Sequence, residues 1–338
     1  METTAFDIQN KPDFATTIAA LQLQDSSTPA SVVFYGLSGL TTEEIENLRP
    51  VWEKLSPALR RKILHEMVEL TETNVELNYH AIGHLSLGDT DPHVREAAIE
   101  VLWEDESLEL LSRLNDLALH DDNREVRATA ASAFGRFVFL VEMGDLPDGE
   151  AGYALQTATS IYRNAKEDIS VRRRALEAMG NTSAEIVAKA IKSAYRSTER
   201  EMQISAVYAM GRTCDERWAK IVMEEIENED AEMRYEAARA SGQLELGDAV
   251  PKLADLLLDD DREVQLAAVW ALGEIGGKES IHLLTLLAEK AQEEEDEDLL
   301  EASEEALGSA SLLGDDLPSL WALEGDVDYA DVADDLDD

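Results

Sequence analysis

The chain has 338 residues, of which 44% are hydrophobic and only 6% aromatic, and it carries a formal net charge of −43. A charge of this sign and size disfavours direct binding of nucleic acids and of anionic membranes, and it favours basic proteins, basic peptides or metal cations as partners. The single cysteine excludes an internal disulfide, and no apolar run is long enough to span a bilayer. No secretory signal opens the chain, so we expect a cytoplasmic protein.

The first part of the chain predicts a flexible segment followed by a helical cap. Residues 1–30 are mostly polar and broken by a Ser-Ser-Thr-Pro run, so we expect them to be flexible. Residues 31–74 predict an N-terminal helical cap of two helices. Thr41 or Thr42 can begin the first helix in a capping box, and Pro57 fits the first turn of the second.

Residues 75–313 repeat a unit of the form Asp-x-x-Val-Arg-x-x-Ala-x-x-Ala-Leu-Gly. The copies read DPHVREAAIEVLW, NREVRATAASAFG, DISVRRRALEAMG, EREMQISAVYAMG, DAEMRYEAARASG, DREVQLAAVWALG and the degenerate DEDLLEASEEALG. The Val position falls at 94, 126, 171, 202, 233, 264 and 299, with three successive gaps of 31 residues. A fixed period of this size is typical of a solenoid, in which each helix pair buries its apolar face against its neighbours. The sequence therefore predicts about seven helix pairs.

Three features of the unit have structural explanations. The residue three before the Val position can cap the second helix of each pair. These cap residues are Asp91, Asn123, Asp168, Glu199, Asp230, Asp261 and Asp296, with Glu199 the weakest by residue type. The final Gly either ends the helix or lets a neighbouring helix approach closely. The Arg after the Val position predicts a ladder of Arg–Asp pairs between units, each worth about 0.2–1 kcal/mol. The ladder residues are Arg95, Arg127, Arg172 and Arg234.

The spacing between two copies is longer than elsewhere. Val126 and Val171 are 45 residues apart, and the extra residues lie from Arg136 to Gly152. We expect the second helix to run on to Met143 before an acidic loop. Insertions in a solenoid fall in loops on one face, which is often functional, whereas a local length variant is the alternative.

The C-terminal end is acidic without any basic residue. No Lys or Arg follows Lys290, while 19 Asp and Glu lie between Glu293 and Asp338, so residues 314–338 predict an acidic disordered tail. This tail carries a small apolar group that could fold back onto the solenoid as an intramolecular occupant. The group consists of Leu317, Leu320, Trp321 and Leu323. There are two alternatives. Either the tail only keeps the protein solvated, or it binds basic proteins in a chaperone-like or nucleic-acid-mimicking role.

The repeated Val-Arg-x-x-Ala-x-x-Ala-Leu-Gly core resembles the HEAT-repeat family, and in particular its short bacterial branch named after phycobilisome lyases. The resemblance covers about 220 residues. It implies an all-α, right-handed α–α superhelix of antiparallel helix pairs, with the second helices on the concave side. It implies no particular reaction, because most arrays of this type are binding surfaces.

Enzyme branches of the family find little support in the residues. Deoxyhypusine hydroxylase holds two irons with several His-Glu pairs, whereas this chain has one such pair, His65-Glu66, outside the repeats. DNA glycosylases of this fold use a basic groove, which a chain of this charge does not favour. A phycobilisome-lyase-like enzyme, or another small-molecule-binding HEAT protein, stays open as the alternative to a non-catalytic scaffold.

The candidate metal ligands and nucleophile are weak, and we expect no cofactor. His80 and His84 are four residues apart on a predicted helix and could grip one metal ion, although a surface or groove position is the simpler interpretation. His65 and His93 lie nearby in sequence. Cys214 at a helix end predicts a small packed residue rather than a nucleophile.

The sharper signal is a stripe on the second helices of repeats four to six. Relative to the Val position, residues at +2 and +6 point away from the buried face. The early repeats have polar or small residues there, such as Glu96, Glu100 and Ser132, whereas the later repeats have large side chains. The candidate binding residues are Ile204, Tyr208, Arg212, Tyr235, Arg239, Leu266 and Trp270. Tyr, Trp and Arg dominate binding hot spots, so we predict a protein-interaction scaffold that holds a peptide or basic protein on its concave face. Coverage of these side chains by neighbouring helices is the alternative.

Overall fold

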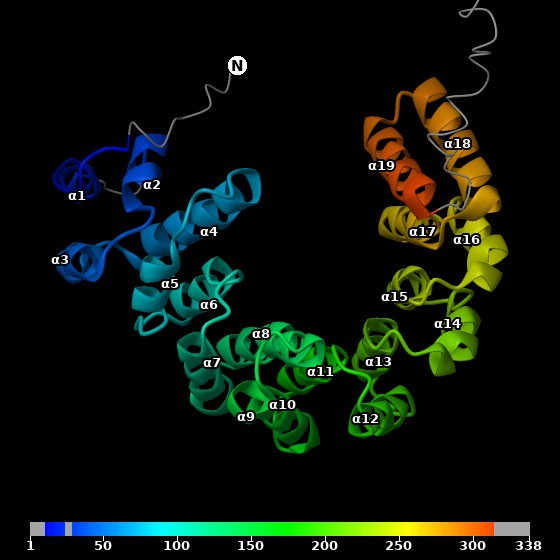
Figure 1. Ribbon diagram of the computed structural model, residues 1–338, viewed down its shortest axis with the longest axis horizontal. Helices are drawn as coiled ribbons and strands as arrows, with labels where there is room; N and C mark the ends of the chain where they lie inside the picture. Colours follow the sequence, from blue (N-terminus) through cyan, green and yellow to red (C-terminus); the bar gives the residue numbers. More distant parts are fainter. Residues whose placement is uncertain (1–10, 24–28, 314–338) are drawn as a thin grey trace, which may run out of the picture. The chain divides into compact units, whose positions relative to one another are not determined.

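The computed structural model describes residues 11–23 and 29–313, and every regular element in this part of the chain is a helix (Figure 1). The chain divides into two compact units, Met1–Thr182 and Ser183–Asp338. None of the helices in the described residues combines the length and apolarity needed to cross a bilayer.

Unit 1 is a stack of helical hairpins. Its elements are α1 (Phe14–Gln22), α2 (Ser31–Leu37), α3 (Thr42–Trp52), α4 (Pro57–Thr73), α5 (His80–Ser86), α6 (Pro92–Val101), α7 (Leu108–His120), α8 (Arg124–Met143), α9 (Asp148–Ala151), α10 (Tyr153–Arg163) and α11 (Ile169–Met179). Helix α4 packs on α6, α6 on α8 and α8 on α11, which makes one row of second helices. Helices α5, α7 and α10 pack beside α6, α8 and α11 respectively, so each forms the first half of a pair.

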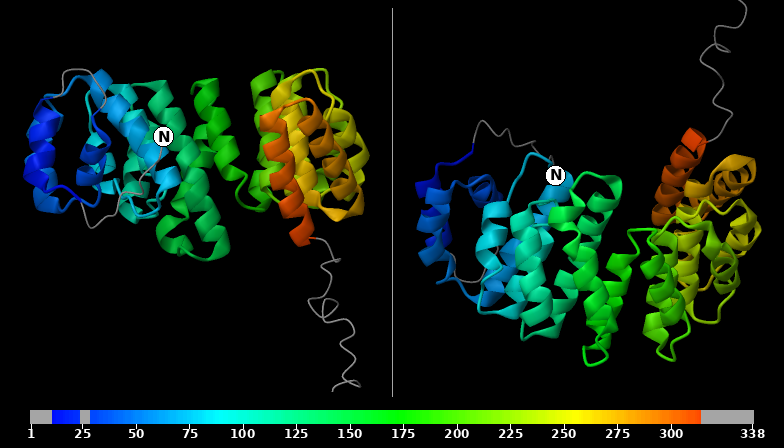
Figure 2. Two further views of the ribbon diagram at one scale, coloured as in Figure 1. Left: turned by 90° about the horizontal axis from the view of Figure 1, so that it is seen from above. Right: turned by 60° about the horizontal axis from the view of Figure 1, so that its bottom comes forward.

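Unit 2 repeats this arrangement. Its elements are α12 (Glu185–Tyr195), α13 (Arg200–Arg212), α14 (Ala219–Glu225), α15 (Ala231–Gln243), α16 (Val250–Leu256), α17 (Arg262–Ile275), α18 (Gly277–Glu293) and α19 (Glu297–Leu313), with 3-10 turns at Glu216–Trp218 and Gly247–Ala249. Helices α13, α15, α17 and α19 pack on one another in that order. Figure 2 shows the helices of each unit lying side by side as hairpins.

The predicted all-α solenoid of about seven helix pairs is confirmed. The pairs are α5–α6, α7–α8, α10–α11, α12–α13, α14–α15, α16–α17 and α18–α19. Each buries the residue at the Val position, which is 0% exposed in α6, α8, α11 and α17. The periodicity of the sequence thus identifies the buried face of each second helix.

The beginning of the chain is more ordered than the sequence suggested. Part of the segment 1–30 that was expected to be flexible forms α1, whose N-terminus is capped by the Asp13 side chain and which packs against α2 and α3. Leu21 is 0% exposed, so burial of an apolar face holds α1 in place. Residues 1–10 and 24–28 lie outside the described part.

The helices of residues 31–74 begin as their sequence predicts. Thr41 and Glu44 form the capping box of α3, in which the Thr41 side chain accepts from the Glu44 N–H and the Glu44 carboxylate accepts from the Thr41 N–H. Pro57 is the first residue of α4, and Ser56 caps it. A third helix, α2, lies in the same stretch, which the sequence analysis did not resolve.

The Arg ladder is present and extends beyond the recognised repeats. Arg95 makes two hydrogen bonds of 2.7 and 2.8 Å to Asp121, and Arg234 makes the same pair of bonds to Asp259. Arg60 on α4 pairs with Asp89 at 2.9 Å in the same way. Helix α4 therefore docks onto the first repeat as one repeat docks onto the next.

Two rungs of the ladder differ from the prediction. Arg127 pairs with Glu167 at 2.8 Å instead of an aspartate. Arg172 donates to the backbone carbonyl of Tyr162, so the expected Arg172–Asp pair is wrong. In the regular rungs the acceptor lies two residues before the cap of the next second helix, and the corresponding residue for Arg172 is Ser197, which has no carboxylate.

The predicted helix caps are confirmed with one informative exception. The side chains of Asp91, Asn123, Asp168, Asp230, Asp261 and Asp296 each accept a hydrogen bond from a backbone N–H of the following turn. Glu199 makes no such bond, and its longer side chain explains why it is the weakest cap. Helix α8 ends at Met143 as expected, with Gly144 in the left-handed region at φ +83°.

The final Gly of the unit serves close helix approach in unit 2. A Cβ atom on Gly211 would lie 2.7 Å from the Cα of Ala240, and one on Gly242 would lie 2.9 Å from the Cα of Ala271. Both distances are too short for a real contact, so only glycine lets α13, α15 and α17 touch backbone to backbone. The packing of unit 2 depends on these positions.

The acidic segment 314–338 lies outside the described residues, together with the intramolecular contact that we considered for Leu317, Leu320, Trp321 and Leu323. Helix α19, the degenerate last repeat, ends at Leu313.

Candidate functional site

Six of the seven predicted binding residues lie half-buried along α13, α15 and α17. We call this set the aromatic row. It consists of Tyr208, Arg212, Tyr235, Arg239, Leu266 and Trp270. Each helix contributes two residues four apart, and the helices pack in sequence order, so the residues follow one another from helix to helix. The row is neither fully buried nor fully exposed.

Ile204 does not belong to the row. Its side chain is only 1% exposed, and the four consecutive residues Ile204–Val207 are all buried. Helix α13 is therefore enclosed on every side at this level, and the ideal helical angle that placed Ile204 on an open face is wrong there. Ile204 is a core residue.

Two aromatic residues of the row, Tyr235 and Trp270, each border a small hollow that is edged by carboxylates. Tyr235 lines a hollow of about 290 Å³ with Ala231, Glu232, Asp261 and Glu263. Trp270 lines another of about 160 Å³ between α17 and α19. The other residues of this second hollow are Leu266, Val269, Glu274, Ala302, Glu305, Ala306 and Ser309. An aromatic surface with carboxylates around it suits a ligand that is both apolar and positively charged.

Arg239 and Trp270 form a pair across two helices. The guanidinium carbon of Arg239 lies 4.1 Å from the centre of the Trp270 ring, which is a cation–π contact worth about 0.5–1 kcal/mol when exposed. The ring also lies over Gly242, where a Cβ would come within 2.8 Å of it. Trp270 is therefore held in one orientation by α15.

Three of the four histidines considered as metal ligands lie near carboxylates. His84 Nε2 lies 2.6 Å from Asp105, His65 lies 3.5 Å from Glu100, and His93 lies 3.4 Å from Glu96. Burial opposes the ionisation of Asp105, but hydrogen bonds from His84 and Ser107 outweigh it and hold the pKa of Asp105 below its usual range. Within the described residues no three potential ligands gather at one point, and His80 and His84 remain a weak metal candidate.

Cys214 is exposed, so the expectation of a small packed residue is wrong. It follows the last turn of α13 with φ +48°, in the left-handed region, and this turn directs its side chain outward.

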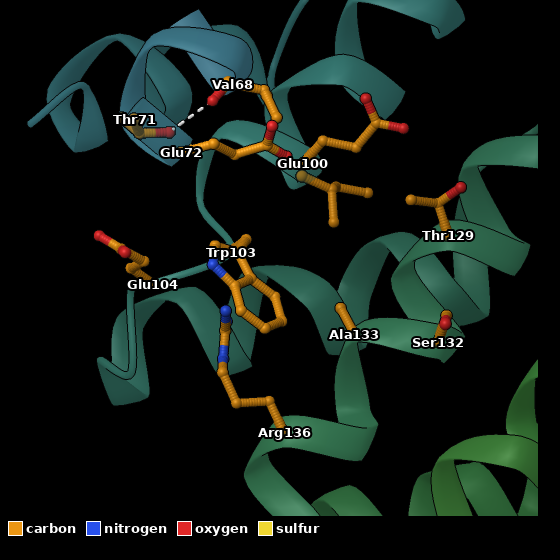
Figure 3. Close-up of a pocket in the computed structure, with 11 residues that line it drawn as sticks. Val68, Thr71, Glu72, Glu100, Trp103, Glu104, Thr129, Ser132, Ala133 and Arg136 are labelled. Carbon is orange, nitrogen blue, oxygen red and sulfur yellow. Dashed lines mark hydrogen bonds between the residues drawn. The ribbon is translucent and has the colours of Figure 1, made fainter. Parts of the chain in front are cut away.

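A hollow larger than the two beside the aromatic row lies in unit 1, where the sequence predicted no site. It has a volume of about 580 Å³ and lies between α4, α6 and α8 (Figure 3). We call it the Trp103 hollow. Its lining residues are Val68, Thr71, Glu72, Ile99, Glu100, Trp103, Glu104, Thr129, Ser132, Ala133 and Arg136. Trp103 is 70% exposed, the only such tryptophan in the described residues.

A short helix creates this hollow. Helix α6 has 10 residues, whereas α4 and α8 on either side have 17 and 20. Because α6 ends at Val101, its neighbours continue past it and leave a space at its C-terminal end. Trp103 stands in the unit where Gly135, Gly211 and Gly242 stand in other repeats. That replacement was the signal in the sequence that could have identified the site.

The walls of the hollow carry opposite charges. Figure 3 shows Glu72 and Glu100 on one side of the Trp103 ring and Arg136 on the other. Arg136 donates to the carbonyl of Leu102 at 3.1 Å, and burial lowers the pKa of this arginine although Asp105 and Glu106 oppose the shift. Burial raises the pKa of Glu100, with Glu96 adding to the effect and His65 opposing it.

The comparison of sequences identifies the repeat. Residues 219–308 match the family model of HEAT repeats. Residues 219–308 are therefore built of HEAT repeats. The matched HEAT region covers α14 to the greater part of α19, and the remaining pairs repeat the same unit. No curated protein matches the sequence significantly.

Solved structures of HEAT and armadillo type resemble the chain at low identity. An engineered protein is 17% identical, covering 88% of each chain, with a TM-score of 0.37. Human deoxyhypusine hydroxylase in complex with glycerol is 16% identical, covering 88% of this chain and 96% of that one, with a TM-score of 0.34. Importin beta is 13% identical, covering 88% of this chain and 44% of that one, with a TM-score of 0.44. Values this low carry no information about activity or partner.

Proposed function

We propose that this protein is a non-catalytic interaction scaffold that holds a segment of a basic partner protein along the aromatic row of unit 2. The observation that carries the proposal is the placement of Tyr235 and Trp270, each of which borders a hollow edged by carboxylates. Aromatic side chains provide the buried anchors of protein interfaces, and carboxylates around them select a positively charged partner.

The two arginines of the row take different parts in this proposal. Arg239 stacks on Trp270 and fixes its orientation, which reduces the entropy lost when a ligand orders the ring. Arg212 lies on α13 and would orient a backbone carbonyl or carboxylate of the partner.

The charges around the row favour a basic partner over the acidic segment 314–338 as occupant. Glu232, Asp261 and Glu263 surround the hollow at Tyr235, and Glu274 and Glu305 lie at Trp270. These carboxylates would repel a chain segment that is itself rich in Asp and Glu. A cytoplasmic location remains a prediction from the sequence.

The test compares Trp270→Ala with a matched control in the same unit. A stoichiometric partner is first captured from the native cell with the full chain, and its dissociation constant is then measured with purified proteins. Hot-spot residues contribute 2 kcal/mol or more, so Trp270→Ala is expected to weaken binding by at least about 30-fold. Leu258, which is 70% exposed and outside the row, supplies the control Leu258→Ala.

Two results would contradict the scaffold. Equal losses for Trp270→Ala and Leu258→Ala would show that the row is not the binding surface. A tightly bound small molecule or chromophore that co-purifies with the wild type and is lost with Trp270→Ala would favour the alternative of a phycobilisome-lyase-like or small-molecule-binding protein.

A further inference from the structure

We propose that the Trp103 hollow of unit 1 is a second binding site, which takes the cationic side chain of an arginine or lysine from an exposed segment of a partner protein. The hollow lies wholly within unit 1 and shares no residue with the aromatic row. The proposal therefore stands independently of the function proposed for unit 2.

The size and lining of the hollow suit a side chain together with its neighbouring backbone. Its volume of about 580 Å³ lies within the usual range of about 300–1,000 Å³ for ligand sites. Val68, Ile99 and Ala133 supply an apolar lining against which a long aliphatic stem can pack. Arginine and lysine both combine such a stem with a charged end.

The Trp103 indole supplies the preferred aromatic surface for a cation. Tryptophan binds cations better than the other aromatic residues do, because its ring has the strongest negative face. Its 70% exposure leaves this face open to a ligand, in contrast to the buried indoles of Trp52 and Trp218. Because Trp103 also lines the hollow, a cation that enters the cavity can reach the face of its ring.

The charged residues that line the hollow decide whether it favours a cation or an anion. Glu72, Glu100 and Glu104 line the hollow, and the single lining cation, Arg136, is already engaged. Its Nη1 donates to the Leu102 carbonyl, its guanidinium lies 4.9 Å from the Phe137 ring, and Asp105 and Glu106 offset its charge. An excess of negative charge therefore faces the cavity, which favours a cation and disfavours the acidic segment 314–338 as occupant.

The surroundings of Glu100 also favour a positively charged ligand. The charged groups that face it are His65 and Glu72 from α4, Glu96 from α6 and Arg136 from α8. Burial and Glu96 raise the pKa of Glu100, so His65 compensates its ionised form only in part. A bound cation supplies the remaining compensation, and binding should weaken as the pH falls through the pKa of Glu100.

The test uses the full chain with 5-fluorotryptophan at its five tryptophans, observed by fluorine NMR. The probe is the peptide acetyl-Gly-Ser-Gly-Arg-Gly-Ser-Gly-amide, and its control carries citrulline, a neutral isostere, in place of arginine. The Trp103 resonance is assigned with Trp103→Phe. We expect a saturable shift of this resonance with the arginine peptide and none with the citrulline peptide. An unmoved Trp103 signal, or equal shifts with both peptides, overturns the proposal.

A pair of variants with the same change of net charge separates the site from bulk attraction. Glu72→Gln/Glu100→Gln removes two carboxylates from the hollow, whereas Glu53→Gln/Asp116→Asn removes two exposed carboxylates elsewhere in unit 1. We expect at least about tenfold weaker binding for the first and less than about threefold for the second. Equal losses in the two variants overturn the proposal.

The same spectrum distinguishes this site from the aromatic row, since Trp270 reports on unit 2. The Trp103 shift should persist in Trp270→Ala. It should do so whether or not this variant loses the partner proposed for the aromatic row, so the failure of one proposal can be told from the failure of the other. A Trp103 shift that disappears in Trp270→Ala would show that the hollow is not an independent site.

Discussion

The two units use the same repeat but leave different surfaces. In unit 2 the second helices are of similar length and touch through glycine, so their half-buried side chains form a shallow row with small hollows. In unit 1 the short α6 lies between two longer helices, and the space beyond its end becomes one large cavity. The comparison teaches that helix length and the residue at the end of the repeat decide whether such an array presents a row or a pocket.

The close packing of unit 2 can be broken at one position. Gly211→Ala would place a Cβ 2.7 Å from the Cα of Ala240, a backbone atom that cannot move aside alone. We expect α13 and α15 to separate and the free energy of unfolding to fall by about 1–3 kcal/mol. Chemical denaturation followed by circular dichroism measures this change.

Gly308→Ala is the matched control for that substitution. Gly308 lies inside α19 with nothing within 4 Å of its missing Cβ, so alanine should stabilise the helix by about 0.5–1 kcal/mol. If both variants change the free energy of unfolding in the same direction, close approach of the helices does not limit the packing of unit 2.

The Arg ladder is common to both units, and its loss should be visible in acid. The Arg234 guanidinium holds the pKa of Asp259 below its usual range, so this pair stabilises the fold above the ordinary pKa of an aspartate and loses its effect as the pH falls through the lowered value. Arg234→Met should lower the stability at neutral pH by about 1–3 kcal/mol and move acid unfolding to higher pH.

An acid titration followed by circular dichroism at 222 nm checks the ladder prediction. The comparison variant is Arg262→Met, because the Arg262–Asp296 pair is more exposed, with side-chain exposures of 39% and 31%. We expect the acid midpoint of Arg262→Met to shift less than that of Arg234→Met. Identical acid midpoints for the wild type and Arg234→Met would contradict a stabilising role for the ladder.

The smallest effect is expected at the Trp103 hollow. Because burial raises the pKa of Glu100, ionisation of this residue disfavours the folded state at neutral pH, and stability should rise slightly as the pH falls through that pKa. Glu100→Gln should therefore leave the free energy of unfolding unchanged or raise it by less than about 0.5 kcal/mol. Thermal unfolding at pH 7 measures this, with Asp116→Asn as the control, and a clear loss of stability would mean that Glu100 has a structural role.

The sequence predicted the fold better than the sites, for physical reasons that can be traced to particular residues. The Val position, the caps and the glycines each report contacts within one pair or between adjacent pairs, so a local pattern contains them. Helical spacing placed the six residues of the row away from the buried stripe, and the structure has them half-buried, while their role in binding stays a prediction. Ile204 was misplaced because its burial depends on everything around α13, which helical spacing does not describe.

The Trp103 hollow was not predicted because it arises from a difference between neighbouring helices. Nothing in the first repeat by itself states that α6 ends at Val101, or that α4 and α8 continue past it. Trp103 stands where most other copies of the repeat have glycine, and this difference marks the position. A comparison of the copies that considers only their shared residues does not detect it. In an array of similar units, the copy that departs from the pattern is where a cavity can form.

The glycine contacts of unit 2 also fix a distance that a partner must match. Helices that touch through glycine and alanine pack at the short end of the usual spacing of about 8–10 Å. Two residues of a β-strand advance about 6.8 Å and three residues of a polyproline II segment advance about 9.3 Å, so a spacing of about 8 Å lies between the two. A segment lying across α13, α15 and α17 is therefore expected to place one anchoring side chain on each helix at every second or third residue.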